Sequence, residues 1–402
     1  MKLTKLMLSA FVAALALVSC QKEEGPSVNG EYKSVEIEIG NIFMTKSAGD
    51  AIAEGTPVVL NNFRIYLTDG NTFYFDATDE NGNIYGVDDY KFTTNQRSLN
   101  FHFVNPSVNK VVAVANLTDA QYASITDYAS LQAFKLDIAN QQNPDGLALF
   151  AEDALEPAGY QHPPVDNGGT HNNLQTNVYK AILNFVPRVA RFELDGFAVN
   201  FKAGAAALYN KISIHQVAFN NYYSEVALST GYVDGTKLVD CQAENSASAV
   251  AYLTGNTGSE WYSDKQTLDF VRPSAMTADT WIEGELGTTF YYHFFPIESA
   301  TPEHPGYPEL MFQLSTEDTE GASSSTYIYT KSFKEVNGAS STVINNFEEG
   351  KIYRMKFVTT GETDNGDGDV PIDEGDIEKL GRCLDIVVTV EDWNVILVTP
   401  EF

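Results

Sequence analysis

The sequence predicts an all-β protein built from two β-sandwich domains in tandem. Short segments in which apolar and polar residues alternate recur along the whole chain, and this period of two is typical of strands with one buried face. Gly, Asn, Asp and Pro separate these segments, as expected for turns between strands. Helical periodicity is rare, and the 402 residues provide enough length for two cores.

Residues 1–19 have the pattern of a secretion signal. Lys2 and Lys5 precede an apolar run over 6–18 that is too short to remain as a membrane-spanning helix. Ser19 and Cys20 follow where a small-residue cleavage signal usually stands. This ending resembles a bacterial lipobox, which implies that Cys20 is acylated on its thiol and becomes the new N-terminus. The alternative is an ordinary secretion signal that ends near a cysteine.

The charge balance excludes partners that need a basic surface. The chain carries 25 basic and 54 acidic side chains, a formal net charge of −29, which would repel nucleic acid and anionic lipid headgroups. The charged run over 21–24 resembles an export signal for surface lipoproteins of Bacteroidales-type bacteria, although a solvated tether would look the same. Cys241 and Cys383 are too few for a disulfide framework, and their pairing stays open.

The expected strands follow one another in the order of the chain. The best-defined helix is expected over 119–134, with Thr118 or Asp119 as its N-cap. The strands are expected over 35–39, 63–67, 73–75, 99–104, 110–115, 179–185, 189–194, 211–219, 289–295, 310–314, 326–329, 351–358, 384–390 and 393–399.

Three stretches interrupt this pattern. Residues 44–56 are small and polar, and residues 156–176 are rich in Pro, Gly, Asn and His, which suggests an accessible segment and an interdomain link. Residues 361–376 form an acidic loop. We therefore expect a tether with an N-terminal strand over 20–56, a first sandwich over 57–176 and a second sandwich over 177–402.

No pattern in the sequence calls for an enzyme, a metal or a cofactor. The six histidines lack metal-ligand spacing, and His162 and His171 are expected to be solvated. The acidic residues of the 361–376 loop do not follow the order of ligands in a calcium-binding EF-hand. Trp261, Tyr262 and Trp281 could stack on sugar rings, but a place in a sandwich core is the more ordinary role.

Several segments, in order along the chain, resemble the fimbrillins of Bacteroidales, the type V pilin superfamily. They are the strand and hairpin over 58–70, the valine-rich strand and Asn over 110–116, the segment 147–156, the strand over 188–194, the segments 294–298 and 351–353, and the terminal strand with its tryptophan over 388–393.

The resemblance implies two transthyretin-like sandwiches that polymerise after proteolysis. A trypsin-like protease would remove an N-terminal strand, here 34–39 or 42–44, and a C-terminal strand of the neighbouring subunit would enter the vacated groove. The donor would lie within 387–402 and include Trp393, Val395, Ile396, Leu397 and Val398, whose two faces are both apolar.

The processing site departs from the family pattern. The family is cleaved after an arginine, but no arginine occurs between Cys20 and Arg64, and Arg64 lies inside an expected strand. Lys46-Ser47 is therefore the expected trypsin-like site. Without cleavage there, the subunit would remain lipid-anchored.

The resulting hypothesis is a structural subunit of a cell-surface pilus that supports adhesion. Its expected partners are other pilin subunits, joined head to tail, the processing protease, the outer membrane through lipid on the precursor, and a host or bacterial surface ligand. One alternative is a lipid-anchored basal or tip subunit of the same pilus. Others are a surface glycan-binding lipoprotein and, least supported, a hydrolase on a sandwich scaffold.

Overall fold

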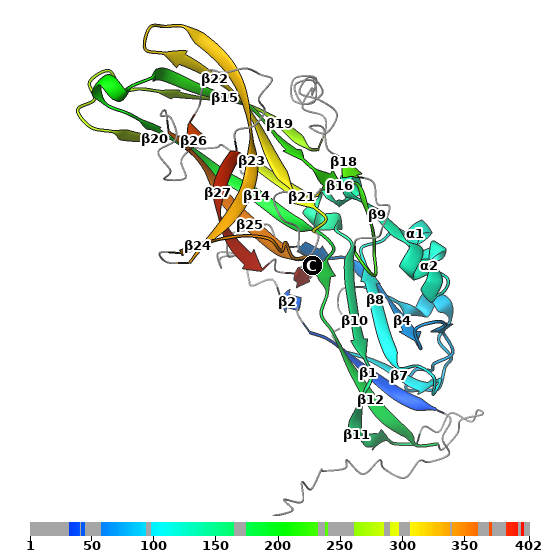
Figure 1. Cartoon of the computed structure of the whole chain (residues 1–402). Coiled ribbons are helices and arrows are strands. Elements are labelled where there is room, and N and C mark those ends of the chain that lie inside the picture. The colour runs from blue at the N-terminus through cyan, green and yellow to red at the C-terminus, as the bar shows by residue number, and fades with distance from the viewer. Residues whose placement is uncertain are drawn as a thin grey trace, which may run out of the picture.

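Strands dominate the part of the chain that the structure describes, which confirms the predicted all-β class (Figure 1). The structure is a computed structural model, and it describes residues 32–40, 42–44, 58–93, 98–164, 174–231, 238–239, 261–284, 290–296, 306–337, 340–360, 370–371, 383–392 and 395–397. Within these residues, no helix is both long and apolar enough to cross a membrane.

Two sheets pack face to face in the N-terminal half, which we define as the described residues up to 187. Phe63 of one sheet contacts Phe92, whose ring lies 6.2 Å from that of Phe101 in the other sheet. The first sheet has the order β11 (Glu156–His162), β12 (Thr176–Leu183), β1 (Lys33–Ile39), β7 (Ser98–Val104). The second has the order β13 (Val186–Pro187), β10 (Leu149–Ala154), β8 (Lys110–Ala115), β4 (Asn62–Thr68), β5 (Phe73–Tyr74), with β6 (Lys91–Thr93) also paired to β4.

Asn116 ends the valine-rich strand β8 in a left-handed conformation, with φ of 60°. Its side chain accepts a hydrogen bond from the Asn61 amide at 2.8 Å and donates to the carbonyls of Val59 at 2.6 Å and Leu147 at 2.8 Å. Asparagine tolerates this conformation and supplies both a donor and an acceptor. The residue therefore fixes β3 (Val58–Leu60) beside the end of β8.

The helix expected over 119–134 is two short helices, α1 (Asp119–Ser124) and α2 (Tyr128–Ala133). Thr118 is the N-cap of α1, as predicted, and accepts a hydrogen bond from the Gln121 amide. The break occurs because Asp127 caps a new helix by accepting from the Ser130 amide at 2.7 Å. Three short 3-10 helices also belong to this half: η1 (Val87–Tyr90), η2 (Ile138–Gln141) and η3 (Pro144–Gly146).

One long sheet makes up most of the C-terminal half, which we define as the described residues from 190 onward. The sheet folds over on itself, since Gly284 of β20 lies against Leu268 and Phe270 of β19 at the opposite end of the strand order. Its order is β19 (Ser263–Val271), β15 (Tyr209–Asn220), β22 (Glu309–Asp318), β23 (Ser323–Asn337), β27 (Cys383–Asp392), β25 (Lys351–Thr360), β14 (Ala190–Phe201), β20 (Thr280–Gly284).

Smaller elements complete the described part of the chain. β21 (Phe290–Phe294) pairs with β14, β24 (Ser340–Val343) with β23, and β26 (Val370–Pro371) with β25. β16 (Tyr222–Tyr223) pairs with β18 (Leu238–Val239), and η4 (Gly204–Ala206) precedes β15.

The chain passes from the sheets of the N-terminal half to the long C-terminal sheet after the domain boundary expected at 176. β12 begins at Thr176 but pairs with β1 and β11, and β13 still pairs with β10. The long C-terminal sheet begins only at Ala190. The Pro- and Gly-rich composition before 176 marks a connection within the first sheet, because residues 156–162 themselves form β11.

The two halves join through direct pairing and hydrogen bonds. β9 (Lys135–Asp137) from the N-terminal half pairs with β17 (Glu225–Ala227) from the C-terminal half. Gln142 donates to the His293 carbonyl at 3.0 Å and accepts from the His293 amide at 3.1 Å. Arg188, between the two halves in sequence, lies 4.2 Å from the Phe150 ring of the N-terminal half, donates to the Leu228 carbonyl at 2.6 Å and pairs with Glu349 in the C-terminal half. These contacts place the halves end to end, as Figure 1 shows.

Candidate functional site

The strand β1 occupies an interior position in the first sheet, although it lies near the start of the chain. It pairs in parallel with β12 from Lys33 to Ile39 and antiparallel with β7 on its other side. Figure 1 shows it in blue, between segments from much later in the sequence. Both backbone edges of β1 are therefore used, so that its removal would leave two strand edges facing each other across one strand width.

One face of β1 is part of the sandwich core. Val35, Ile37 and Ile39 alternate along the strand and are 0%, 1% and 5% exposed. At ~1.5–3 kcal/mol for each fully buried aliphatic side chain, the three contribute roughly 5–9 kcal/mol to holding the strand in place. This alternation is the pattern that the sequence predicted for 35–39.

A β-bulge in β7 marks the beginning of β1. His102 and Phe103 together lie opposite Ser34, because Lys33 pairs with Val104 and Val35 pairs with Phe101. Phe103 adopts a φ of 54°, which is unusual for a bulky residue. A bulge bends its strand and redirects side chains, here at one end of the β1 position.

A buried polar cluster forms at this bulge, and sequence reasoning missed it. The Ser34 hydroxyl hydrogen-bonds to His102 Nδ1 at 3.0 Å and to the Thr176 hydroxyl at 2.5 Å. The centre of the His162 ring lies 4.1 Å from that of the His102 ring, with the two planes tilted by 49°. Burial, with a smaller effect of His162, lowers the pKa of His102 to about 4. His102 is therefore neutral near pH 7 and hydrogen-bonds to β1.

The outer face of β1 carries charged contacts. The Tyr160 hydroxyl donates to Glu36 Oε2 at 2.6 Å, and Lys180 lies 3.4 Å from the same oxygen. Exposed pairs such as these contribute little to stability, so the buried face holds the strand. Lys33, at the start of β1, lies on the same face as Val35. It donates to the Val108 carbonyl at 2.5 Å and lies 4.7 Å from the centre of the Tyr179 ring, and burial lowers its pKa.

A separate three-stranded sheet brings the two ends of the described chain together. β28 (Val395–Leu397) lies between β2 (Ile42–Met44) and β3, and pairs in parallel with both. Ile396 is in register with Phe43 on one side and Val59 on the other. Part of the expected donor segment therefore pairs with part of the expected removable segment.

The other part of the expected donor segment lies in the chain's own C-terminal sheet. Residues 387–392 belong to β27, which pairs in parallel with β23 and antiparallel with β25. A donor beginning at 387 would have to leave this interior position. The segment that pairs outside the C-terminal sheet begins at Val395.

Some predicted site residues lie outside the described residues. These are Cys20, Lys46, Ser47, Trp393 and Val398. Cys241 does so as well, and the loop over 361–376 does so except for β26. Val395, Ile396 and Leu397 are described as the backbone of β28.

The aromatic residues considered for sugar binding lie partly in the core and partly at the surface. Trp261 packs 4.9 Å from Tyr222 and next to Tyr262, which supports the core role, whereas Trp281 in β20 is 48% exposed. His162, expected to be solvated, is partly exposed and its ring contacts that of His102. Within the described residues, no three His, Cys, Asp or Glu side chains are grouped so as to hold a metal ion.

Comparison with known proteins gives matches among solved structures. No family model matches the sequence, and neither does any curated protein. A fimbrilin from Porphyromonas gingivalis is 14% identical, with a TM-score of 0.47 and coverage of 91% of this chain and 99% of that one. An inferred cell adhesion protein from Bacteroides eggerthii is 14% identical, with a TM-score of 0.48 and coverage of 92% and 98%. Another from Parabacteroides distasonis is 12% identical, with a TM-score of 0.44 and coverage of 92% and 99%.

Proposed function

We propose that the chain is a structural subunit of a cell-surface pilus whose copies join by exchange of a strand. The observation that carries the proposal is the position of β1, an N-terminal strand placed between β12 and β7 in the interior of a sheet. A cut between β1 and β3 would separate β1 from the rest of the chain covalently. The position vacated by β1, which we call the slot, would then offer an incoming strand unpaired backbone groups on both sides and an apolar surface beneath it.

The C-terminal strand of a second copy is the proposed occupant of that slot. Residues 395–398 (Val-Ile-Leu-Val) are apolar at every position, so either face of this segment offers two apolar side chains for the core positions of Val35, Ile37 and Ile39. Donor and acceptor are different surfaces of one molecule. The contact is therefore heterologous and extends into a chain of subunits instead of closing into a dimer.

The same cut would also loosen the donor. β2 precedes Lys46 in sequence and pairs with β28 in the precursor. Cleavage at Lys46-Ser47 would detach β1 and β2 together, opening the acceptor slot and depriving β28 of one of its two partner strands. Lipid on Cys20 would be lost with the same fragment, so cleaved subunits leave the membrane and uncleaved ones remain as an anchor at the base.

The proposal is tested on protein sheared from the cell surface. N-terminal sequencing and intact-mass analysis should give a start at Ser47 in a ladder of oligomers, and Lys46→Ala should leave full-length lipidated protein that does not polymerise. Lys33→Ala is the matched control, because Lys33 lies inside β1 and is shielded from a protease. Polymers whose subunits still begin at Cys20 would refute exchange at the β1 position.

A second experiment examines the donor separately. A chain ending at Asn394 keeps β27 but lacks β28. It should be processed normally and accumulate as monomers. Filaments of normal length from this truncation would show that the donor lies elsewhere.

A further inference from the structure

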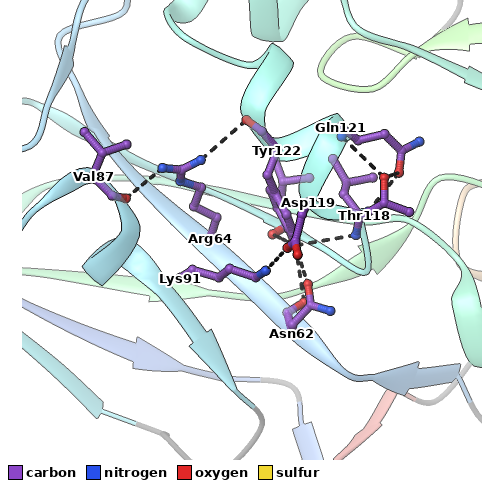
Figure 2. Close-up of polar contacts among 10 residues, drawn as sticks. Asn62, Arg64, Val87, Lys91, Thr118, Asp119, Gln121 and Tyr122 are labelled. Atoms are coloured by element: carbon purple, nitrogen blue, oxygen red, sulfur yellow. Dashed lines mark hydrogen bonds and ion pairs between the residues drawn. The ribbon is translucent and has the colours of Figure 1, made fainter.

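A pocket of about 700 Å³ lies beside β4 in the N-terminal half, away from β1. Arg64, Phe75, Val87, Tyr122 and Ile125 line it, together with residues at its mouth. Arg64 lies on the opposite face of β4 from Phe63 and Ile65, and extends toward α1 and η1 (Figure 2). The pocket is therefore walled by apolar side chains and contains one deeply placed cation.

Arg64 is only 6% exposed, and its charge lacks a carboxylate partner within the described residues. It donates to the Val87 carbonyl at 2.7 Å and to the Tyr122 carbonyl at 3.4 Å, as Figure 2 shows, and its Nε is buried without an acceptor. A guanidinium has five N–H donors. Two backbone carbonyls leave most of its hydrogen-bonding capacity unused.

A buried cation without a counter-ion is costly to the fold. The rings of Tyr66 and Phe75, each 5.7 Å from the Arg64 guanidinium carbon, compensate only in part. A methionine or leucine would fill the same position of β4 without this cost. The buried guanidinium therefore has a charge and free donors that can meet an anionic group from outside the described part of the chain.

The other charges of the pocket lie at its mouth. Lys91 pairs with Asp119, and its ammonium also lies 5.5 Å from the centre of the Tyr122 ring (Figure 2). Asp88 is exposed, so solvent and salt screen its charge. The mouth thus has little net attraction for anions, and the two carboxylates there disfavour a dianion such as phosphate.

We propose that this pocket binds a small organic monocarboxylate with an apolar body. The carboxylate would form paired hydrogen bonds with the Arg64 guanidinium, the geometry that this fork-shaped donor favours. The apolar body would pack against Phe75, Val87 and Ile125, in a cavity whose volume is typical of small-ligand sites. A sugar acid fits less well, because its hydroxyl groups would face apolar walls.

The test is calorimetric titration of the full chain with 3-phenylpropionate. Its uncharged amide, 3-phenylpropanamide, is the matched ligand of the same shape. Phenylpropionate should bind at least ten-fold more tightly than the amide, and Arg64→Met should abolish this difference. Equal affinity for acid and amide, unchanged binding by Arg64→Met, or no heat of binding at millimolar ligand would each overturn the proposal.

Three further measurements complete the test. Ile125→Trp fills the pocket while leaving Arg64 in place, and it should also abolish binding even if Arg64→Met does not fold. Lys91→Met at the mouth should alter affinity less than three-fold. Glucuronate probes the acidic-sugar alternative, and binding tighter than that of phenylpropionate would refute the apolar body. Since the pocket contains no residue of β1, failure here would leave strand exchange untouched.

Discussion

Single polar contacts decide how firmly the start of β1 is held. Ser34 hydrogen-bonds to His102 and Thr176, and all three side chains are buried. The pKa of His102 falls from its ordinary value of 6.5 to about 4 because burial disfavours the charged ring. The nearby carboxylates of Asp79 and Glu36 act in the opposite direction and are outweighed.

The His102 contact predicts acid sensitivity with a definite direction. The unfolded chain binds the proton more readily than the folded one, so the stabilisation is complete above pH 6.5 and is lost as pH falls from 6.5 toward 4. The free energy of unfolding should drop by about 2 kcal/mol between pH 7 and pH 5 from this residue alone. Urea denaturation at both values measures it.

His102→Gln retains a hydrogen-bonding side chain but cannot take up the proton, so the drop should shrink by that amount. His215→Gln is the control, because His215 is only partly buried and hydrogen-bonds to Ser315 in the C-terminal half. An identical pH dependence of wild type and His102→Gln would contradict the assignment.

Within the strand β1, the buried face and the exposed face contribute separately to the free energy of unfolding. Ile37 pairs with Ala181 and Leu99 and is 1% exposed, whereas its neighbour Glu38 is exposed. Ile37→Ala should lower the free energy of unfolding of the uncleaved chain by about 2–5 kcal/mol. Glu38→Ala should change it by less than about 0.5 kcal/mol.

Comparing the uncleaved chain with assembled, cleaved subunits shows whether the effect of Ile37→Ala comes from β1. Chemical denaturation of filaments assembled from cleaved subunits should give the same midpoint for wild type and Ile37→Ala, since neither would then contain residue 37. A difference that persists after cleavage would show that β1 remains in the mature subunit.

Local sequence patterns predict the strands themselves but not their neighbours. The valine-rich strand over 110–115 and the alternating strand over 35–39 both form where expected. Their pattern of apolar residues depends only on neighbouring positions in the sequence. The parallel pairing of β1 with β12 joins residues about 144 positions apart, as in Lys33 with Asn177. No alternation in either strand specifies that partner, and so the boundary expected at 176 divided a sheet.

The polar cluster at the start of β1 was not predicted for the same reason: its contacts join residues that are far apart in the sequence. His102 lies in a strand and His162 next to Pro163, with no metal-ligand spacing to connect them. Only the bulge in β7 turns His102 toward Ser34. Arg64, by contrast, lies inside a strand, as the sequence predicts, and is 6% exposed. Its lack of a carboxylate partner depends on tertiary packing that the sequence does not display.

At the scale of the whole molecule, the two halves behave as one mechanical unit if their junction is firm. Arg188 is central to it: its guanidinium lies 4.2 Å from the Phe150 ring in the N-terminal half. On the other side it donates to the Leu228 and Ser229 carbonyls at 2.6 and 3.0 Å and pairs with Glu349. Arg188 therefore links the two halves through contacts on both sides.

The junction predicts a single cooperative unfolding transition for the wild-type chain. Arg188→Ala should lower the free energy of unfolding by about 3 kcal/mol, because Glu349 and two carbonyls lose their partner. It should also split the calorimetric transition into two, as each half then melts on its own core. Lys211→Ala breaks the exposed pair with Asp269 at 2.8 Å and should change stability by less than about 1 kcal/mol, with one transition retained. Two transitions in the wild-type chain would mean that the halves unfold independently, and force along a filament would then act on each half separately.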